Sequence, residues 1–380
     1  MEFGWSPEEE ALRLEVRAFL DENLPPWWDT EDAKLGTVRH SEYSREFAPK
    51  LAERGWLTPH WPREHGGRDA PAWYHFILGE ELWLRGEPRG PQYMNVNWVG
   101  PSIIAHGNDD QKRRYLPPIS AGKVIWCQGF SEPEAGTDLA SLRTRAVRDG
   151  DHYVVNGQKV WTSYANVADH CFLLVRTDPD APKHQGITIL LVPMSAPGLE
   201  VREINSLMGD HAFHELFFTD VRVPVADRLG DENGGWQIVM RTLAYERVGI
   251  PRYCRAQLEV DRLAAWAAEQ GMADDPVVLD RLAAAEAACE AARLLVYRVV
   301  DERAKNVGDS GNVYVARAAM VQAERMVGDL GVDLMGGQGL VRGSIADDQY
   351  RDSLAAGIAS GTYEVQLNLV ARRHLDLAVR

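Results

Sequence analysis

The strongest restriction on the fold comes from residues 124–223, where strand-like runs follow one another with no helical pattern between them. Asp149-Gly150 and Asn156-Gly157 are turn dipeptides, and they predict hairpin-type turns on either side of residues 152–155. Such closely spaced strands predict an antiparallel sandwich or barrel and disfavour a Rossmann domain. The expected strands lie within residues 171–175, 186–192, 199–204 and 215–223, after a short β-prone run at 124–126.

Helical patterns flank this region on both sides. Residues 6–9, Ser-Pro-Glu-Glu, form a capping-box pattern that apolar residues follow at helical spacing. Beyond Gly234 the sequence is helical again, with a helix start at Asp275-Pro276. We therefore predict an α+β chain with an N-terminal α-helical domain at 1–122, a middle antiparallel β-domain at 123–231 and a C-terminal α-helical bundle at 232–380.

The composition argues against several functional classes. Lysine and arginine number 41 against 56 aspartate and glutamate, a formal charge of −15, which gives nucleic-acid binding no electrostatic support. The first residues are acidic and include no apolar run, so we expect no signal peptide. The most apolar stretch, 187–194, is too short to span a membrane as a helix. The cysteines are too scattered for a disulfide framework or a zinc knuckle, so we expect reduced thiols in a cytoplasmic protein. They are Cys127, Cys171, Cys254 and Cys289.

Nucleotide-binding and metal motifs are absent or incomplete. There is no Walker A loop, and residues 337–342 fail the dinucleotide pattern because Arg342 takes the place of its last glycine. His211, His214 and Glu215 lack the spacing of a zinc-binding helix, so we expect a solvated loop there and no metal site.

A different set of motifs is specific in its order along the chain. It comprises Ser-Glu-Pro-Glu-Ala-Gly-Thr-Asp at 131–138, Trp-Thr-Ser at 161–163, Glu-Leu-Phe-Phe at 215–218, Glu-Arg at 246–247, Gly-Gly-Gln-Gly at 336–339 and Ser-Gly-Thr at 360–362. With these motifs the chain resembles the acyl-CoA dehydrogenase family over essentially its whole length. Members of that family are flavoenzymes that oxidise the Cα–Cβ bond of acyl-CoA thioesters.

The resemblance implies FAD as the cofactor and places two segments against it. The loop at 128–137 is rich in small and polar residues, which permits a close backbone approach to the flavin. Trp161 corresponds to the aromatic wall of the flavin, and Ser163 to a hydroxyl that hydrogen-bonds N5. The implied cofactor contacts in these segments are Gln128, Phe130, Ser131, Gly136, Thr137, Trp161, Thr162 and Ser163.

In the C-terminal part the resemblance implies that Asp333, Gly336 and Gly337 contact the FAD of a partner subunit. It implies Thr362 and Glu364 as further contacts of FAD. Two departures from the family pattern concern the FAD diphosphate. Asp333 stands where glutamine is common, and a carboxylate is unfavourable beside a diphosphate. The Arg-x-x-Phe-Gly motif is absent from residues 266–271, a departure shared with heteromeric bacterial sterol side-chain acyl-CoA dehydrogenases.

The catalytic base distinguishes subclasses of the family. Most members have a glutamate where this chain has Ser360, and a serine hydroxyl is too weak a base for an α-proton. Isovaleryl-CoA dehydrogenase-like members use a glutamate before an arginine, which corresponds to Glu246 before Arg247. We therefore predict Glu246 as the base, with the backbone N–H of Ser360 directed at the thioester oxygen. Thr362 is an expected N-cap, which puts Glu364 in the first helical turn and favours a dipole role over a base.

The resemblance implies an acyl-CoA substrate that contacts Thr137, Tyr245, Arg247 and Gly361, and an electron-transferring flavoprotein as the electron acceptor. It implies a homo-oligomer, dimer or tetramer, or a heteromer with a second acyl-CoA dehydrogenase chain. Room beside Ser360 predicts a branched or bulky acyl group. Three alternatives stay open: a flavin oxidase or monooxygenase, a dehydrogenase of acyl groups on a carrier protein, and a flavin-poor structural subunit.

Overall fold

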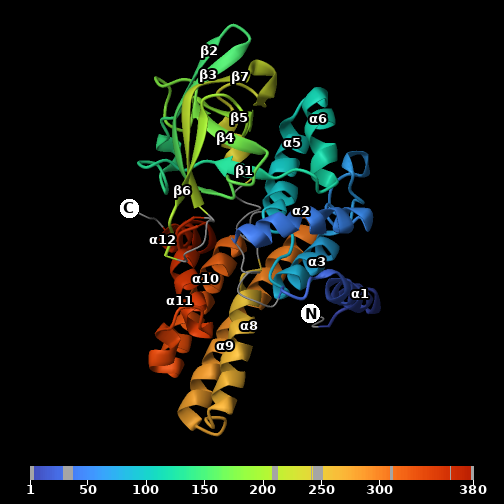
Figure 1. Ribbon diagram of the computed structural model, residues 1–380, viewed down its shortest axis with the longest axis vertical. Helices are drawn as coiled ribbons and strands as arrows, with labels where there is room; N and C mark the ends of the chain where they lie inside the picture. Colours follow the sequence, from blue (N-terminus) through green and yellow to red (C-terminus); the bar gives the residue numbers. More distant parts are fainter. Residues whose placement is uncertain are drawn as a thin grey trace. The chain divides into compact units, whose positions relative to one another are not determined.

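The computed structural model describes residues 4–28, 37–207, 213–240, 242, 251–308, 311–359 and 361–377. Its helices and strands, labelled in Figure 1, form two compact units, each built from segments that are separate in the sequence. Unit 1 consists of Met1–Leu24, Pro71–Glu87 and Glu246–Arg380, and unit 2 of Pro25–Ala70 and Pro88–Tyr245.

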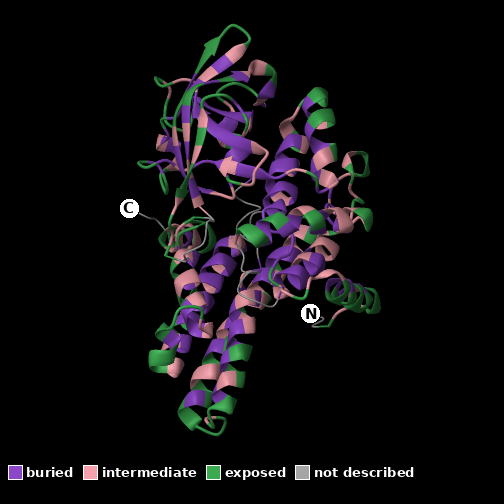
Figure 2. Ribbon diagram, in the orientation of Figure 1, coloured by how far each residue is buried: buried purple, intermediate pink, exposed green. Residues whose placement is uncertain are grey.

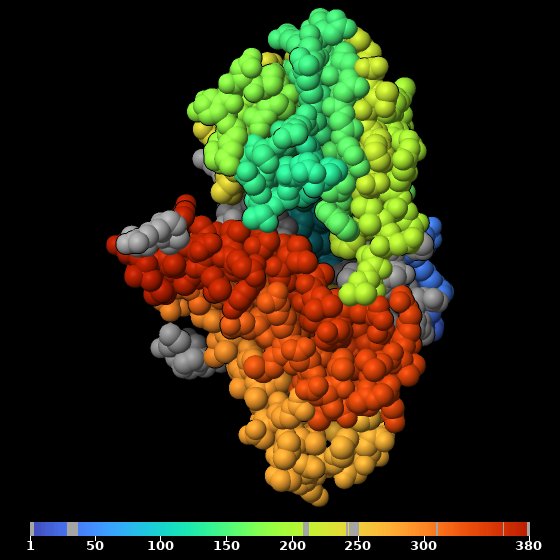
Figure 3. Space-filling view, turned by 90° about the vertical axis from the view of Figure 1, so that its left-hand side faces the viewer, coloured from blue at the N-terminus to red at the C-terminus, as the bar shows by residue number. Residues whose placement is uncertain are grey.

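Unit 1 is helical. Its principal helices are α1 (Pro7–Asn23), α3 (Ala72–Leu84), α8 (Tyr253–Glu269), α9 (Pro276–Ala304), α10 (Asn312–Met335), α11 (Ile345–Ala356) and α12 (Tyr363–Leu369). The α10 helix packs against α8, α9, α11 and α12. Its small residues permit this closeness: a Cβ built on Gly328 would come within 2.7 Å of the Ser353 hydroxyl on α11. The helices α11 and α12 reach the surface, red in Figure 3.

The helix starts in unit 1 follow the sequence signals. At α1 the Ser6 hydroxyl accepts a bond of 3.2 Å from the Glu9 amide, and the Glu9 carboxylate accepts one of 2.8 Å from the Ser6 amide. At α9 the Asp275 carboxylate accepts from the Val277 amide at 2.8 Å, with Pro276 at the first helical position. Both predicted caps are confirmed.

Unit 2 combines a sheet with the helices α2 (Val38–Glu53), α4 (Gln92–Met94), α5 (Gly100–His106) and α6 (Asp109–Ser120). Its strands are β1 (Trp126–Gly129), β2 (Arg145–Asp149), β3 (His152–Ser163), β4 (His170–Arg176), β5 (Ile187–Pro193), β6 (Leu199–Ile204), β7 (Phe213–Pro224) and β8 (Arg228–Leu229). They pair in the order β6-β7-β3-β2-β4-β5-β8, and β1 pairs with β4. The pairing is antiparallel except for β1 with β4 and one bridge between β2 and β4.

One predicted turn is wrong. Asp149-Gly150 does separate β2 from β3, but Asn156-Gly157 lies inside β3, at an irregularity in its pairing with β7. A Cβ at position 157 would come within 2.7 Å of the Thr144 Cα. The glycine therefore permits the residue before β2 to pass close to β3, and the chain does not reverse there.

Strand residues that point inward build an apolar core in unit 2. It includes Tyr153, Val155, Leu173, Leu190, Leu216, Val221 and Val223, all 0% exposed. Figure 2 shows long purple, buried stretches along the sheet. Along the chain, helices come first, the strands follow, and helices return after the strands. This order confirms the predicted α+β class.

Candidate active site

The loop that follows β1 is shaped by close packing. A Cβ on Gly129 would come within 2.8 Å of the Leu173 side chain and 2.9 Å of the Cys171 sulfur, so a larger residue would displace these side chains. Glu132 and Ala135 exchange two backbone hydrogen bonds of 3.0 Å, which close a tight turn. Beyond this turn Gly136 is exposed, and a Cβ there would meet nothing within 4 Å. The loop therefore offers open backbone at Gly136.

The end of β3 presents an aromatic side chain to solvent. Trp161 is 60% exposed and has a φ of +57°, and it lies at a bulge between Lys159 and Thr162 in the pairing with β7. Bulges redirect side chains and are frequent beside active sites. The Trp161 ring contacts Phe213 edge-on, with centroids 6.0 Å apart. An exposed, fixed aromatic ring is the wall that a planar cofactor requires.

The structure brings the β1 loop and the end of β3 together. The Val160 amide donates to the Ser131 carbonyl at 2.9 Å, and the Lys159 ammonium donates to the Phe130 carbonyl at 3.0 Å. Phe130 is buried and packs against Phe172, with ring centroids 6.0 Å apart. The segments 128–137 and 161–163, both of which the resemblance places against FAD, are thus joined in the fold.

The two joined segments fit an isoalloxazine ring system. The Gln128 side-chain nitrogen and the Thr162 hydroxyl are both buried, and neither has a hydrogen-bond partner among the residues that the structure describes. Buried polar groups in proteins are normally satisfied, so these two are suited to the polar edge of a ligand. Together with the exposed Trp161 they match what a flavin needs, donors and acceptors beside an aromatic wall.

In unit 1, the predicted contacts to the adenosine-diphosphate end of FAD lie where α10 ends. Gly336 has a φ of +53°, and a Cβ on Gly336 or Gly337 would meet nothing within 4 Å. The Asp333 carboxylate pairs with Arg281 of α9 at 2.5 Å. Sequence analysis missed Arg281, whose charge offsets the carboxylate that made Asp333 unfavourable near a diphosphate.

The loop between α11 and α12 carries further predicted residues. The Thr362 hydroxyl accepts from the Val365 amide at 3.3 Å and caps α12, and Glu364 lies in the first turn, as predicted. Gly361 has a φ of +88°, a conformation that favours glycine. The guanidinium of Arg317 is buried and donates to the carbonyls of Ala356 at 2.6 Å and Ala359 at 3.0 Å.

Several predicted residues lie outside the described part of the chain. They are Tyr245, Glu246, Arg247 and Ser360, together with His211 of the discarded metal motif. Their roles stay predictions. His214 is described, and there the expectation of a solvated loop is wrong, because this residue lies on β7 and is 2% exposed.

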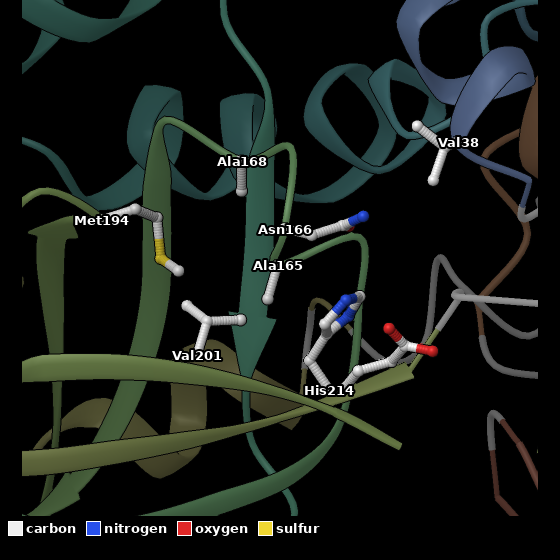
Figure 4. A pocket seen from close by; sticks show the side chains of 8 residues that line it. Val38, Ala165, Asn166, Ala168, Met194, Val201 and His214 are labelled. Carbon is white, nitrogen blue, oxygen red and sulfur yellow. The ribbon is translucent and has the colours of Figure 1, made fainter. Parts of the chain in front are cut away.

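A pocket of about 540 Å³ lies in unit 2 beside the chain that follows β3 (Figure 4). Figure 4 shows Met194 and Val201 on one side of it, with Asn166 and His214 on the other. Its lining is Val38, Ala165, Asn166, Ala168, Met194, Val201, Glu203 and His214, and none of these was predicted to contact FAD or substrate.

The described residues include neither a metal-binding cluster nor a helix that could span a membrane. Within those residues no group of three or more histidine, cysteine, aspartate or glutamate side chains is arranged to hold a metal ion. Among the described helices, none combines the length and the apolar character needed to cross a membrane.

Sequence analysis also missed the charged groups beneath the site. Lys159, Arg176 and Arg317 are all buried, and each donates to backbone carbonyls of a loop that carries or borders predicted site residues. A lysine or arginine in a strand or helix gives no local signal that its partner is a distant carbonyl.

Comparison with known proteins places the whole chain in one family. Profiles of the acyl-CoA dehydrogenase N-terminal, middle and C-terminal domains match residues 6–123, 127–221 and 233–375. Acyl-CoA dehydrogenase IpdE1 of Mycobacterium tuberculosis is 34% identical, over 97% of each chain. The structure of the ChsE4-ChsE5 complex from Mycobacterium tuberculosis contains a chain 33% identical, with a TM-score of 0.89 and full coverage of both chains. A structure described as the Tcur3481-Tcur3483 steroid ACAD gives 32% identity, the same TM-score and full coverage of both chains.

Proposed function

Because the chain belongs to the acyl-CoA dehydrogenase family of FAD-dependent oxidoreductases, we propose that it oxidises the thioester of a branched or bulky acyl group with Glu246 as the base. The observation that carries the flavin part of this proposal is the surface at Trp161. There an exposed aromatic ring lies beside two buried polar atoms that have no partner among the described residues.

In the proposed reaction the Glu246 carboxylate takes the α-proton of the thioester. Bound FAD supplies at N5 the acceptor for the hydride that leaves Cβ. The Ser360 amide donates to the thioester oxygen and so stabilises the negative charge that develops there. Thr137, Tyr245, Arg247 and Gly361 are proposed to hold the substrate in this orientation.

We propose that residues of this chain hold FAD in two groups. The residues proposed at the isoalloxazine are Gln128, Phe130, Ser131, Trp161, Thr162 and Ser163. Gly136 and Thr137 are proposed to lie near the flavin diphosphate and the substrate. Asp333, Gly336 and Gly337 are proposed to contact the FAD of a partner subunit, where Arg281 neutralises the Asp333 carboxylate. Thr362 and Glu364 are further proposed contacts of FAD.

The acyl group is inferred from the size of the residue at position 360. Serine is smaller than the glutamate common in the family, which leaves volume beside Cα and Cβ. One solved relative is described as a steroid ACAD, which is consistent with a ring-bearing group. We infer a branched or ring-bearing acyl-CoA.

We also propose that the chain works in an assembly and passes electrons to an electron-transferring flavoprotein. Apolar side chains on the C-terminal elements of unit 1 are exposed, including Leu340 at 72%, Val341 at 62% and Ile358 at 68%. An exposed apolar patch marks a surface that another chain can cover, and we propose that these side chains belong to one. Two solved relatives are described by paired names, ChsE4-ChsE5 and Tcur3481-Tcur3483. A heteromer of two acyl-CoA dehydrogenase chains or a homo-oligomer would both cover this surface.

The test is single-turnover bleaching of the flavin with straight-chain, branched and ring-bearing acyl-CoAs under anaerobic conditions. Glu246→Gln should retain FAD and bind acyl-CoA, because amide and carboxylate have similar shapes. Its flavin should be reduced several orders of magnitude more slowly, because the amide cannot take the proton. Ser360→Ala should cost much less.

Three outcomes would contradict the proposal in different parts. Near wild-type bleaching by Glu246→Gln with loss in Glu364→Gln would assign the base to the last helix. Bleaching only by long straight chains would contradict the bulky acyl group. Purified assembly without any flavin would favour a structural subunit.

A further inference from the structure

We propose that Lys159 is a positioning residue for the flavin site, which together with Glu132 fixes the backbone of the loop over residues 130–144. The inference rests on the proposed function, because that loop is a predicted contact of FAD. It concerns Lys159, which lies beneath the loop, and Glu132, which belongs to the loop, and neither residue was predicted to touch the cofactor.

The Lys159 side chain is completely buried, and its ammonium group has two partners. It donates to the Phe130 carbonyl at 3.0 Å and to the Glu132 carboxylate at 2.7 Å. Both partners belong to the loop that follows β1, whereas Lys159 belongs to β3. A buried ammonium is costly unless it is paired, so the position of the loop and the position of the lysine are tied together.

Glu132 extends the connection to the far end of the loop. Its carboxylate accepts from the Arg143 amide at 2.6 Å and from the Thr144 amide at 2.9 Å. Burial alone would raise the pKa of Glu132, but the Lys159 ammonium and these hydrogen bonds outweigh it and lower the pKa. The ionised carboxylate therefore joins Lys159 to the backbone on both sides of the loop.

The bulge in β3 explains how one strand places Lys159 beneath the loop and Trp161 at the surface. Successive strand residues normally alternate between faces. Here Lys159 and Val160 are both buried, and Trp161 is exposed with a positive φ. The bulge therefore sends the lysine beneath the loop and the tryptophan out to the surface where the flavin is predicted.

A second buried cation holds the part of the loop that Lys159 does not reach. The Arg176 guanidinium donates to the Ala140 carbonyl at 2.6 Å and to the Gln185 carbonyl at 2.6 Å. The loop is thus tethered at 130–132 by Lys159, at 143–144 by Glu132 and at 140 by Arg176. Between these tethers lies the exposed backbone of Gly136 and Thr137.

Removing the ammonium should alter the conformation of the loop more than that of the rest of unit 2. In Lys159→Met the Glu132 carboxylate loses its counter-charge and the Phe130 carbonyl loses its donor. An uncompensated buried charge is unfavourable, so the loop is expected to move until water reaches the carboxylate. The Phe130 and Ser131 backbone would then leave the geometry that a flavin requires.

The test compares the full-length chain with Lys159→Met, Glu132→Gln and a matched control. Asp227→Asn is the control, because Asp227 is buried in the same unit and accepts from Arg114 at 2.8 Å and Tyr115 at 2.9 Å, both on α6. Two quantities are measured: amide hydrogen exchange of residues 130–144 in FAD-free protein, and the FAD dissociation constant by fluorescence titration.

We expect faster exchange at 130–144 and a rise of about 10- to 100-fold in the FAD dissociation constant for Lys159→Met. The visible flavin absorption at saturating FAD should also shift. Asp227→Asn should lower stability without either change. Glu132→Gln should behave like Lys159→Met, and the double variant should lose less affinity than the two single losses combined, since both remove one connection.

Wild-type exchange and wild-type FAD affinity in Lys159→Met would overturn the proposal, as would equal loss of FAD affinity in Asp227→Asn. If Lys159→Met does not fold, Glu132→Gln decides the question by the same measurements. If the wild type binds no FAD, the proposed function fails, and hydrogen exchange in the FAD-free chain alone decides whether Lys159 fixes the loop.

Discussion

Two groups of buried charges, one in each unit, have different kinds of partners. In unit 1 the guanidinium of Arg13 is 5% exposed and pairs with the carboxylates of Glu80 and Glu81. In unit 2 the ammonium of Lys159 pairs with Glu132. The Arg13 group joins side chains on helices, whereas the Lys159 group also bonds to the backbone of a loop.

The Arg13 group connects four helices. The hydroxyls of Tyr253 on α8 and Tyr297 on α9 both donate to Glu80 on α3, the second at 2.8 Å, and Arg13 lies on α1. Burial raises the pKa of both tyrosines, so they remain protonated donors at neutral pH. Glu80 and Glu81 outweigh the opposing effect of burial and raise the pKa of Arg13.

The kind of partner distinguishes two roles of a buried charge. Where every partner is a side chain on a regular element, the charge fixes how elements pack. Where the partners are backbone groups of an irregular loop, the charge fixes the conformation of that loop, and loops carry most binding residues. Substitutions of Arg13 and Arg317 test this distinction, and a substitution of Thr362 tests an uncharged contact of the same loop.

The largest effect is expected for Arg13→Met. Removing the guanidinium leaves two buried carboxylates without their counter-charge, and breaking such a group costs about 3–5 kcal/mol in the free energy of unfolding. FAD affinity of the folded protein should not change, because none of the Arg13 partners is a predicted cofactor contact. Chemical denaturation and FAD titration measure the two quantities.

Arg17→Met is the matched control for that change. Arg17 bonds to Glu81 at 2.7 Å, but its side chain is 53% exposed, so its removal should cost less than about 1 kcal/mol. Weaker FAD binding by folded Arg13→Met would show that a buried charge with side-chain partners also shapes the site, and the distinction would be lost.

A smaller effect on stability is expected for Arg317→Met. Arg317 donates to two carbonyls at the end of α11 and in the loop beyond it, so its removal leaves buried acceptors and should cost about 2 kcal/mol. Because its partners are backbone groups leading to Ser360, we expect kcat/KM for acyl-CoA to fall while FAD affinity is kept. Arg317→Lys keeps the charge near the helix end and should recover part of kcat/KM. Lower stability of Arg317→Met with unchanged kcat/KM would show that Arg317, like Arg13, fixes how helices pack and does not shape the site.

Much of the fold follows from local signals in the sequence. The capping box at Ser6, the Asp275-Pro276 start and the Thr362 cap all have the predicted geometry, because each depends on residues within one helical turn. The motifs of the loop at 128–137 and the strand end at Trp161 are specific in type and order, so the prediction could place both segments against one cofactor.

What could not be predicted depends on contacts between distant residues. Asn156-Gly157 has the composition of a hairpin turn, yet its glycine is required by the close approach of Thr144, the residue before β2. The partner of Lys159 is 27 positions away, and alternation along β3 would place Lys159 and Trp161 on the same face. Only the bulge, which forms against β7, separates them.

The smallest effect is expected for Thr362→Ala, which removes the hydroxyl that caps α12. Losing an N-cap costs about 1 kcal/mol, and Thr37→Ala, which removes the corresponding bond to the His40 amide at the start of α2, should cost about the same. Thr362 adjoins Gly361, a predicted substrate contact, so we expect KM for acyl-CoA to rise in Thr362→Ala and to stay constant in Thr37→Ala. Thr362→Ser should restore both stability and KM, because serine caps equally well. If Thr362→Ala and Thr37→Ala have equal KM values and equal losses in stability, Thr362 only stabilises its helix. Arg317 would then be the residue that shapes this loop.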